Sequence, residues 1–410
     1  MSSQEKPGSS RSALLPIFLI VLVDVLGFTI VIPLLPFYAE RFGASPLVAT
    51  TLVSVYAVCS LISTPIIGKL SDQYGRKPLL MYSQAGTCAG FIVLAFSTSL
   101  WMVFIGRILP GLSAGNLSIA QAYISDHTAP ENRAKAFGII GIAFGIGFMF
   151  GPALGGWLGT YSLHLPFIVA AGFSAVAMFF TYTLLPKETQ PPPQHAEVGP
   201  GGRRPSAFDW RTYAEFFGRP ELRALYVQFF LFSFAFSCFF SGFALFAEHN
   251  DELRWGPDEV GYLFTFAGFL GILMQGGLLG RLVKRYGEFK MTVASFAASV
   301  VAYSLIGIST ALWMLMVATT INAFGHGILR PVLTARLTQA VGRHEQGVVL
   351  GISGSLGSVA MAMAPPTGGV MLNGGYLVAW AMIPAVVSAI GLIATLAWSG
   401  VTERSRDHAA

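Results

Sequence analysis

Charged residues are scarce in this chain. Only 11% of its 410 residues are Asp, Glu, Lys or Arg, whereas soluble domains carry about 25%. Because 54% of the residues are hydrophobic and the mean hydropathy is +0.63, there are too few polar side chains to cover a water-exposed surface. This composition excludes a soluble enzyme and predicts an integral membrane protein.

Cysteine is rare and nucleotide-binding motifs are absent. The three cysteines, Cys59, Cys88 and Cys238, lie inside hydrophobic runs without metal-ligand spacing, so we expect packing roles and no metal site. The sequence contains neither GxxxxGKS nor GxxxxGKT, which argues against a pump driven by ATP. We therefore expect no enzymatic activity and no cofactor.

Long uncharged runs predict α-helical membrane spans. Strands of a membrane barrel alternate in polarity over about 10 residues, whereas these runs are long enough for helices of about 20 residues. We expect one span in each of Ala13–Tyr38, Arg41–Lys69, Lys77–Arg107, Arg107–Asp126, Arg223–Glu248 and Glu259–Arg281, and two in each of Lys135–Lys187, Lys290–Arg330 with its continuation, and Glu345–Glu403. The prediction is an all-α membrane protein with twelve transmembrane helices.

A polar linker, residues 190–220, is predicted to separate an N-terminal six-helix half, 1–189, from a C-terminal half, 221–410. Its part from Gln190 to Trp210 is too rich in Pro, Gly and charge for a packed core. GKLSDQYGRK at Gly68 and GRLVKRYGEFK at Gly280 share Gly, Leu, Tyr and Gly, and the glycines and proline of 138–156 recur in 351–369. Two pseudo-repeats of this kind predict a transporter whose substrate site lies near mid-membrane between the halves.

Basic residues predict the orientation of the spans. Of the 25 Lys and Arg residues, all but Arg41, Arg107, Arg254 and Arg330 fall in the tails or in the loops on the same side as the tails. The positive-inside rule then places both termini in the cytoplasm, and we expect a multi-pass protein of the bacterial inner membrane. The net charge of +5 follows from this topology and does not indicate nucleic-acid binding.

Four motifs resemble those of the major facilitator superfamily over essentially the whole chain. GKLSDQYGRKP at 68–78 resembles its loop between helices 2 and 3, and GRILPGLSAG at 106–115 resembles its helix 4 motif. GIAFGIGFMFGPALGG at 141–156 resembles the helix 5 motif of proton antiporters, and LVDVLGFTIVIPLLPFY at 22–38 resembles the first helix of drug and tetracycline exporters. The resemblance implies the major facilitator fold. In one departure from tetracycline exporters, the predicted helix Met291–Thr310 contains no acidic residue.

Asp24 is the only carboxylate predicted in the middle of a span. An ionised group there costs several kcal/mol unless it is protonated, paired or hydrated. We predict that Asp24 binds and releases the transported proton and that Arg107, in the fourth span, is its coupling partner. The alternatives are a permanent structural pair and, for Arg107, a packing role.

A short loop and the end of the fourth span predict a cytoplasmic gate, made of Asp72, Arg76, Lys77 and Asp126. We expect Asp72 to pair across the interface between the halves when the cytoplasmic side is closed, and Arg76 to contact Asp126. The alternative is solvated loop charge, which contributes little.

Polar residues among many Phe residues predict a roomy apolar cavity with a few hydrogen-bonding positions. The predicted substrate-binding residues are Asn116, Gln121, Gln228, Ser233, Ser237, Asn322, His326 and Arg330. His326 and Arg330 lie one turn apart, and the fixed cation should keep the imidazole neutral. For each polar residue an interhelical hydrogen bond is the alternative, and for Arg330 a structural role.

Small residues recur every four positions in the fifth span, at Gly147, Gly151 and Gly155, beside Pro152. This spacing predicts one helix face that a neighbouring helix can approach closely, with a bend at the proline. The resemblance adds a sealing role against leak.

The predicted function is proton-coupled export of lipophilic small molecules, of the multidrug or tetracycline-like kind, by alternating access. The proton gradient supplies the energy, and the expected partners are a small-molecule substrate, protons and the lipid bilayer, with no nucleic acid and a monomeric chain. Two alternatives are a proton-coupled symporter of a small metabolite and a non-transporting membrane receptor or scaffold.

Overall fold

The computed structural model describes residues 10–128, 133–186, 210–342 and 345–407, and every regular element within them is a helix. Twelve helical segments are long and apolar enough to cross a membrane, so the predicted number of spans is confirmed. The elements are α1 (Ser10–Val31), η1 (Ile32–Leu34), α2 (Leu35–Glu40), α3 (Pro46–Tyr74), α4 (Arg76–Ala95), α5 (Leu100–Leu112), α6 (Asn116–His127), α7 (Arg133–Tyr161), α8 (Leu165–Leu184), α9 (Trp210–Gly218), α10 (Pro220–His249), α11 (Pro257–Leu273), the π-helical turn η3 (Met274–Leu278), α12 (Leu279–Tyr286), α13 (Glu288–Gly307), α14 (Leu312–Gln339), α15 (Gln346–Asn373) and α16 (Leu377–Asp407).

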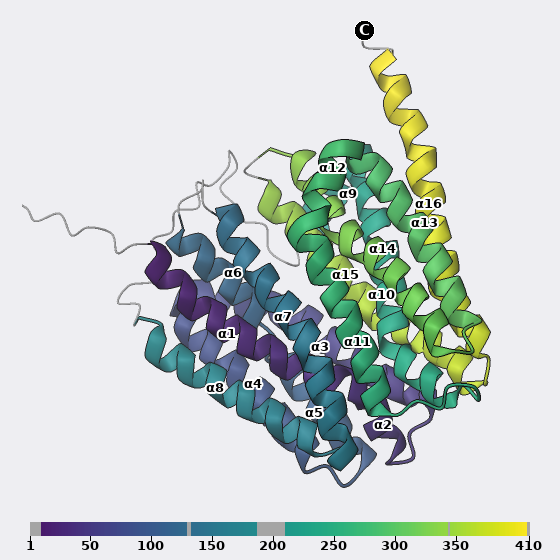
Figure 1. Ribbon diagram of the computed structural model, residues 1–410. Coiled ribbons are helices and arrows are strands. Elements are labelled where there is room, and N and C mark those ends of the chain that lie inside the picture. The colour runs from purple at the N-terminus through teal and green to yellow at the C-terminus, as the bar shows by residue number, and fades with distance from the viewer. Residues whose placement is uncertain (1–9, 129–132, 187–209, 343–344, 408–410) are drawn as a thin grey trace, which may run out of the picture.

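The spans form two bundles, one from α1 to α8 and one from α10 to α16 (Figure 1). The described chain begins at Ser10 and ends at Asp407 on one face of the molecule, called the terminal face below. The opposite face carries the end of α2 and the ends of α7, α10 and α15. Between the halves, α3 packs against α15 and α7 packs against α11.

Hydrophobic burial is distributed unevenly between the two faces. The largest core, called the shared core below, joins both halves near the opposite face and includes Tyr38, Phe167, Phe243 and Trp380. Toward the terminal face each half has a core of its own. The core of the first half is made of buried residues between Ile17 and Leu185, and that of the second half of buried residues between Phe216 and Ile352. The two halves are therefore packed together at the opposite face.

Backbone contacts between the halves lie on the same side. A Cβ atom built on Gly261 of α11 would lie 2.5 Å from the carbonyl oxygen of Pro152 in α7, and one built on Gly369 of α15 would lie 3.0 Å from the Cα of Leu47 in α3. Nearer the terminal face, a Cβ on Gly68 or on Gly351 would meet no described atom within 4 Å. Close contacts between α7 and α11 extend to mid-span, where a Cβ on Gly268 would lie 2.6 Å from the Phe148 carbonyl oxygen. Because the two halves have separate cores toward the terminal face, we interpret this conformation as closed at the opposite face and open toward the terminal face.

The two halves repeat local geometry as well as sequence. Gly75, before α4, has φ 95° and ψ 155°, and Gly287, before α13, has φ 79° and ψ 157°. A side chain is strongly disfavoured at positive φ, so glycine sets both turns. The residues that follow differ in charge, since Arg76 begins α4 and Glu288 begins α13.

The segment before α10 is partly helical. Residues 190–209 of the predicted linker lie outside the described residues, but Trp210–Gly218 forms α9, and Phe216 packs in the core of the second half. Arg219 donates two hydrogen bonds, at 2.8 and 3.0 Å, to the carboxylate of Glu345 at the start of α15. These bonds hold the pKa of Glu345 below its usual range, and the pair ties the start of α10 to α15.

The glycine stripe of α7 lies against α1. A Cβ on Gly147 would lie 2.5 Å from Val25, and one on Gly151 would lie 2.0 Å from Thr29 Oγ1. The Thr29 hydroxyl donates a 2.9 Å hydrogen bond to the Gly147 carbonyl, and a Cβ on Gly155 would lie 2.5 Å from the Ile30 carbonyl oxygen. The spacing of four residues thus gives α1 and α7 a close contact, while Pro152 faces α11.

Replacing Gly151 by Val is expected to destabilise the protein by about 1–3 kcal/mol or more, because the new side chain overlaps Thr29. The measurement is the thermal midpoint of unfolding and the yield of monodisperse protein. Gly141→Val is the matched control, because a Cβ at this position in α7 meets no described atom within 4 Å. Equal stability of the two variants would contradict the close contact.

Candidate functional site

The fourth span is broken in its middle. It contains α5 and α6, and α5 ends after Pro110 while the segment 113–115 is not helical. The break frees backbone carbonyls, and hydroxyl groups of the second and third spans donate hydrogen bonds to three of them. These bonds run from Ser63 to Gly111 at 2.6 Å, from Thr64 to Ala114 at 3.2 Å, and from Ser83 to Ser113. Irregular backbone at this depth is therefore satisfied by side chains inside the protein.

The break presents Asn116 to Asp24. Asn116 is the first residue of α6, and its Nδ2 donates a 2.7 Å hydrogen bond to Asp24 Oδ2 in α1. The other carboxyl oxygen of Asp24, Oδ1, is buried and has no hydrogen-bond partner among the described residues. A half-satisfied carboxyl group inside a span favours the neutral, protonated form.

Arg107 does not form an ion pair with Asp24 among the described residues. Its side chain is 1% exposed, and the guanidinium lies 4.7 Å from the ring centre of Tyr56 in α3. Its Nε is buried and has no hydrogen-bond partner among these residues. The guanidinium therefore rests on Tyr56 in this conformation, and the coupling of Arg107 to Asp24 stays a prediction.

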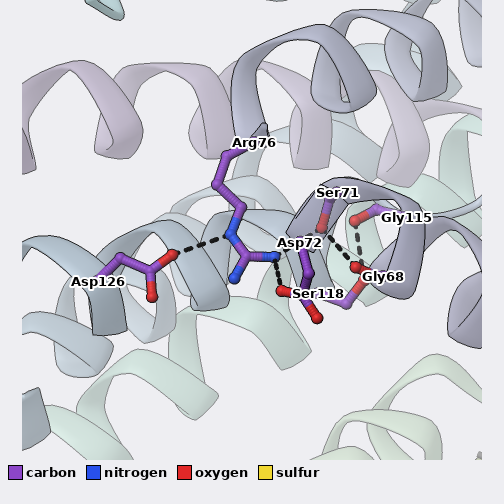
Figure 2. A network of polar contacts seen from close by, with 7 residues as sticks. All are labelled: Gly68, Ser71, Asp72, Arg76, Gly115, Ser118 and Asp126. Carbon is purple, nitrogen blue, oxygen red and sulfur yellow. Dashed lines mark hydrogen bonds and ion pairs between the residues drawn. The ribbon is translucent and has the colours of Figure 1, made fainter. Parts of the chain in front are cut away.

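A buried arginine connects three elements at the terminal face. Arg76 is 8% exposed, and its side chain contacts Asp72 at 2.6 Å, Asp126 at 2.9 Å and the Ser71 hydroxyl at 2.7 Å (Figure 2). The predicted contact of Arg76 with Asp126 is present. Asp72 lies on the last turn of α3 and pairs with Arg76 inside the first half. Because the terminal face is open here, pairing of Asp72 with the other half stays a prediction for the closed conformation.

Lys77, the remaining residue of the predicted gate, contacts the end of α8. Its ammonium group donates a 2.7 Å hydrogen bond to the carbonyl oxygen of Tyr182 and another to that of Leu185, at the end of α8. A cation at this position satisfies free carbonyls and interacts favourably with the helix dipole. Lys77 thus anchors α8 within the first half in this conformation.

The predicted substrate residues lie in separate groups. Asn116 belongs to the Asp24 site, and Gln121 is exposed on α6. Ser233 and Ser237 are half-buried on α10, whereas Gln228 and Asn322 are 2% and 8% exposed, with amide oxygens that have no hydrogen-bond partner among the described residues. Gln228 lines a cavity of about 370 Å³ inside the second half, together with Glu221, Glu288, Arg336, Gln339 and Trp398.

His326 is packed between two phenylalanines of α10. Its ring stacks at 4.0 Å on Phe236 and at 5.0 Å on Phe232, and its Nδ1 is buried without a hydrogen-bond partner among the described residues. Such packing favours the neutral imidazole. One turn further along α14, Arg330 is exposed, and no ion pair of its guanidinium is found within the described part of the chain.

An aromatic column connects His326 to the first half. Phe236 stacks on Phe240 at 5.3 Å, Phe240 contacts Phe148 of α7 at 5.9 Å, and Phe148 stacks on Phe144 at 6.4 Å. Ring contacts therefore run from one half to the other, at the level where α7 and α10 meet.

Comparison with known proteins agrees with this architecture. The family model described as "Major Facilitator Superfamily" matches residues 17–288 and 245–410, which together span nearly the whole chain. The chain belongs to the major facilitator superfamily. The fold is similar to that of the human organic anion transporter MFSD10, with a TM-score of 0.72 at 23% identity over 95% of this chain and 100% of that one.

The curated relatives of this major facilitator protein include drug resistance proteins that are similar in sequence over most of their length. The tetracycline resistance protein, class C, of Escherichia coli is 31% identical over 368 residues, 87% of this chain and 88% of that protein. Multidrug resistance protein 2 of Bacillus subtilis is 25% identical over 401 residues, 96% of this chain and 97% of that protein.

Three site residues of this superfamily member were not found by sequence reasoning. Tyr56 contacts Arg107, and Phe232 and Phe236 enclose His326. The last two share one face of α10 because they are four residues apart, and this spacing was the available signal. Nothing in the sequence distinguishes Tyr56 from other aromatic residues of the spans.

Arg76→Lys is expected to lower the free energy of unfolding by about 1.5–3 kcal/mol, since an ammonium cannot bridge Ser71, Asp72 and Asp126 together. Amide hydrogen exchange around Gly75 should accelerate, and transport should fall. Lys69→Arg is the control, because Lys69 is an exposed cation near the end of the preceding helix, α3. Unchanged exchange in Arg76→Lys would show that the network does not order the loop.

Proposed function

We propose that this protein is a proton-coupled exporter of lipophilic small molecules that works by alternating access. The observation that carries the proposal is the Asp24 carboxyl, which lies inside a span with one oxygen bonded to Asn116 and the other buried without a partner among the described residues. Membership of a transporter family and similarity to tetracycline and multidrug resistance proteins support export of drugs.

Asp24 holds the proton while the molecule is open to the terminal face. Burial inside the span favours the protonated carboxyl in this conformation, whereas the hydrogen bond donated by Asn116 favours the ionised form and offsets only part of the effect of burial. The proton leaves when a cation approaches or water enters, and Arg107 is the nearby cation whose guanidinium rests on Tyr56. Movement of α3 relative to α5 therefore changes the affinity of Asp24 for protons.

The terminal face is the cytoplasmic face in this proposal. The network of Arg76 and the chain ends lie on that face, and the positive-inside rule assigns its many Lys and Arg residues to the cytoplasm. Substrate then enters from the cytoplasm or inner leaflet into the space between the halves. The bacterial inner membrane is the proposed location, and the chain works as a monomer.

Asp24→Asn is expected to abolish uphill transport, because an amide cannot exchange a proton. Proteoliposomes with an imposed pH gradient and tetracycline or ethidium as probe measure accumulation, which should fall to background. Tetracycline binding should remain within about threefold of the wild type, since Asn imitates the protonated carboxyl.

Asp251→Asn serves as the control, because this acid is exposed in the loop after α10. A drug susceptibility panel in an efflux-deficient host, run with the same variants, identifies the substrates. An Asp24→Asn protein that still pumps against a gradient would exclude Asp24 as the coupling residue.

Arg330→Ala is expected to reduce export of neutral or weakly anionic substrates more than export of permanent cations, because the exposed guanidinium repels cations and attracts anions. The ratio of chloramphenicol to ethidium efflux should fall by about threefold to tenfold, a contact worth about 0.6–1.4 kcal/mol. Arg254→Ala, an exposed loop arginine, should leave the ratio unchanged. Equal loss for both probes with poor expression would instead indicate a structural role.

A further inference from the structure

A group of titratable side chains lies between the halves at the opposite face. Glu40 is the last residue of α2 in the first half, and Glu248 and His249 end α10 in the second half. A carboxylate oxygen from each glutamate and a ring nitrogen of His249 all lie within 4.8 Å of one another. These three residues are called the opposite-face cluster below.

The cluster is partly removed from water. The Glu40 side chain is 19% exposed and the His249 side chain 46%, and Glu248 Oε2 is buried without a hydrogen-bond partner among the described residues. His249 Nδ1 lies 2.9 Å from the Leu245 carbonyl, so it carries a hydrogen there, and Nε2 lies 3.7 Å from Glu40 Oε1. The neighbouring aromatic residues Tyr38, Phe243 and Phe246 belong to the shared core.

Few other charges act on the cluster. Arg41 is exposed at the end of α2, and Asp251 pairs with Arg254 at 3.3 Å in the next loop. Asp258 and Glu259 lie in the first turn of α11, where Glu259 accepts a hydrogen bond from the Gly256 amide. The ends of α3, α15 and α16 on this face carry no acidic or basic residue. His164, just before α8, is the other histidine here, and its Nδ1 lies 3.1 Å from the Tyr38 hydroxyl and 2.9 Å from the Ala95 carbonyl oxygen.

Two ionised carboxylates at this separation repel one another, and a single proton between them turns the repulsion into a hydrogen bond. A proton on His249 adds attraction to Glu40. Because Glu40 and Glu248 belong to different halves, separation of the halves at this face relieves the repulsion between the two carboxylates.

We propose that Glu40, Glu248 and His249 form a proton-binding latch that closes the opposite face. The latch rests on the alternating access of the proposed function and adds a second proton site to it. Protonation from the opposite side favours the conformation open to the terminal face, and loss of the proton favours opening of the opposite face. By linkage, the closed conformation binds more protons, so its population rises as pH falls.

The test measures distances across the opposite face in the full-length chain in lipid nanodiscs. Spin labels are attached through Thr98→Cys and Thr310→Cys, exposed residues in the opposite-face loops of the two halves, with Cys59, Cys88 and Cys238 replaced by Ala. As pH falls from about 8 to about 5, the range in which His titrates, the closed-to-open ratio should rise by up to about tenfold per pH unit for one shared proton.

Glu248→Gln should hold the face closed at every pH, because its amide donates a hydrogen bond to Glu40 without a titrating proton. Glu40→Gln should behave alike. Glu252→Gln, an exposed acid three residues beyond His249, should keep the wild-type response and is the matched control.

Three results overturn the latch. One is a wild-type distance distribution that does not change with pH, and another is a wild-type pH response in Glu248→Gln. The third is closure that requires added Zn²⁺ and disappears with EDTA at constant pH, which would assign the cluster to a metal ion.

Tetracycline added at constant pH separates this proposal from the proposed function. Distances that move with tetracycline but not with pH reject the latch alone. Distances that stay fixed with tetracycline, with pH and in every variant reject alternating access and the latch together.

Discussion

Every peptide group in the hydrocarbon layer needs a hydrogen-bond partner inside the protein, and this requirement organises the centre of the first half. The fourth span is interrupted at 113–115, and the freed carbonyls accept hydrogen bonds from Ser63, Thr64 and Ser83. The same interruption starts α6 at Asn116, whose amide reaches Asp24. The hydrogen bonds at this break therefore connect α1, α3 and α4 to the fourth span, and they include the bond that positions Asn116 against Asp24.

The sequence predicted the spans and the repeat because both depend on composition and spacing. The length of a hydrophobic run determines where a helix can cross a membrane. Gly75 and Gly287 occupy equivalent positions in the two repeated motifs, and their backbone angles are similar, as the repeat suggests. The contact of Arg76 with Asp126 was also predictable, since a loop and a span end must meet at the membrane edge.

Contacts in the middle of the bundle were not predictable in the same way. Asp24 accepts a hydrogen bond from Asn116, the first residue after the break in the fourth span, and Arg107, before the break, rests on Tyr56. The rotation of one helix about its axis changes every partner, and hydropathy carries no information about it. Glu40 and Glu248 were missed for a related reason, because only the packing of the two halves brings span ends so distant in sequence together.

The shared core has a consequence for how the chain is assembled. Residues of the first half such as Tyr38 and Phe167 complete this core only with Phe243 and Trp380 of the second half, which leave the ribosome much later. Lipid tails can cover that apolar surface in the meantime, because a membrane exerts no hydrophobic force between helices. The first bundle can therefore fold in the bilayer before the second is made, stabilised by its own core toward the terminal face. Close contacts such as that of Pro152 with Gly261 then join the two bundles.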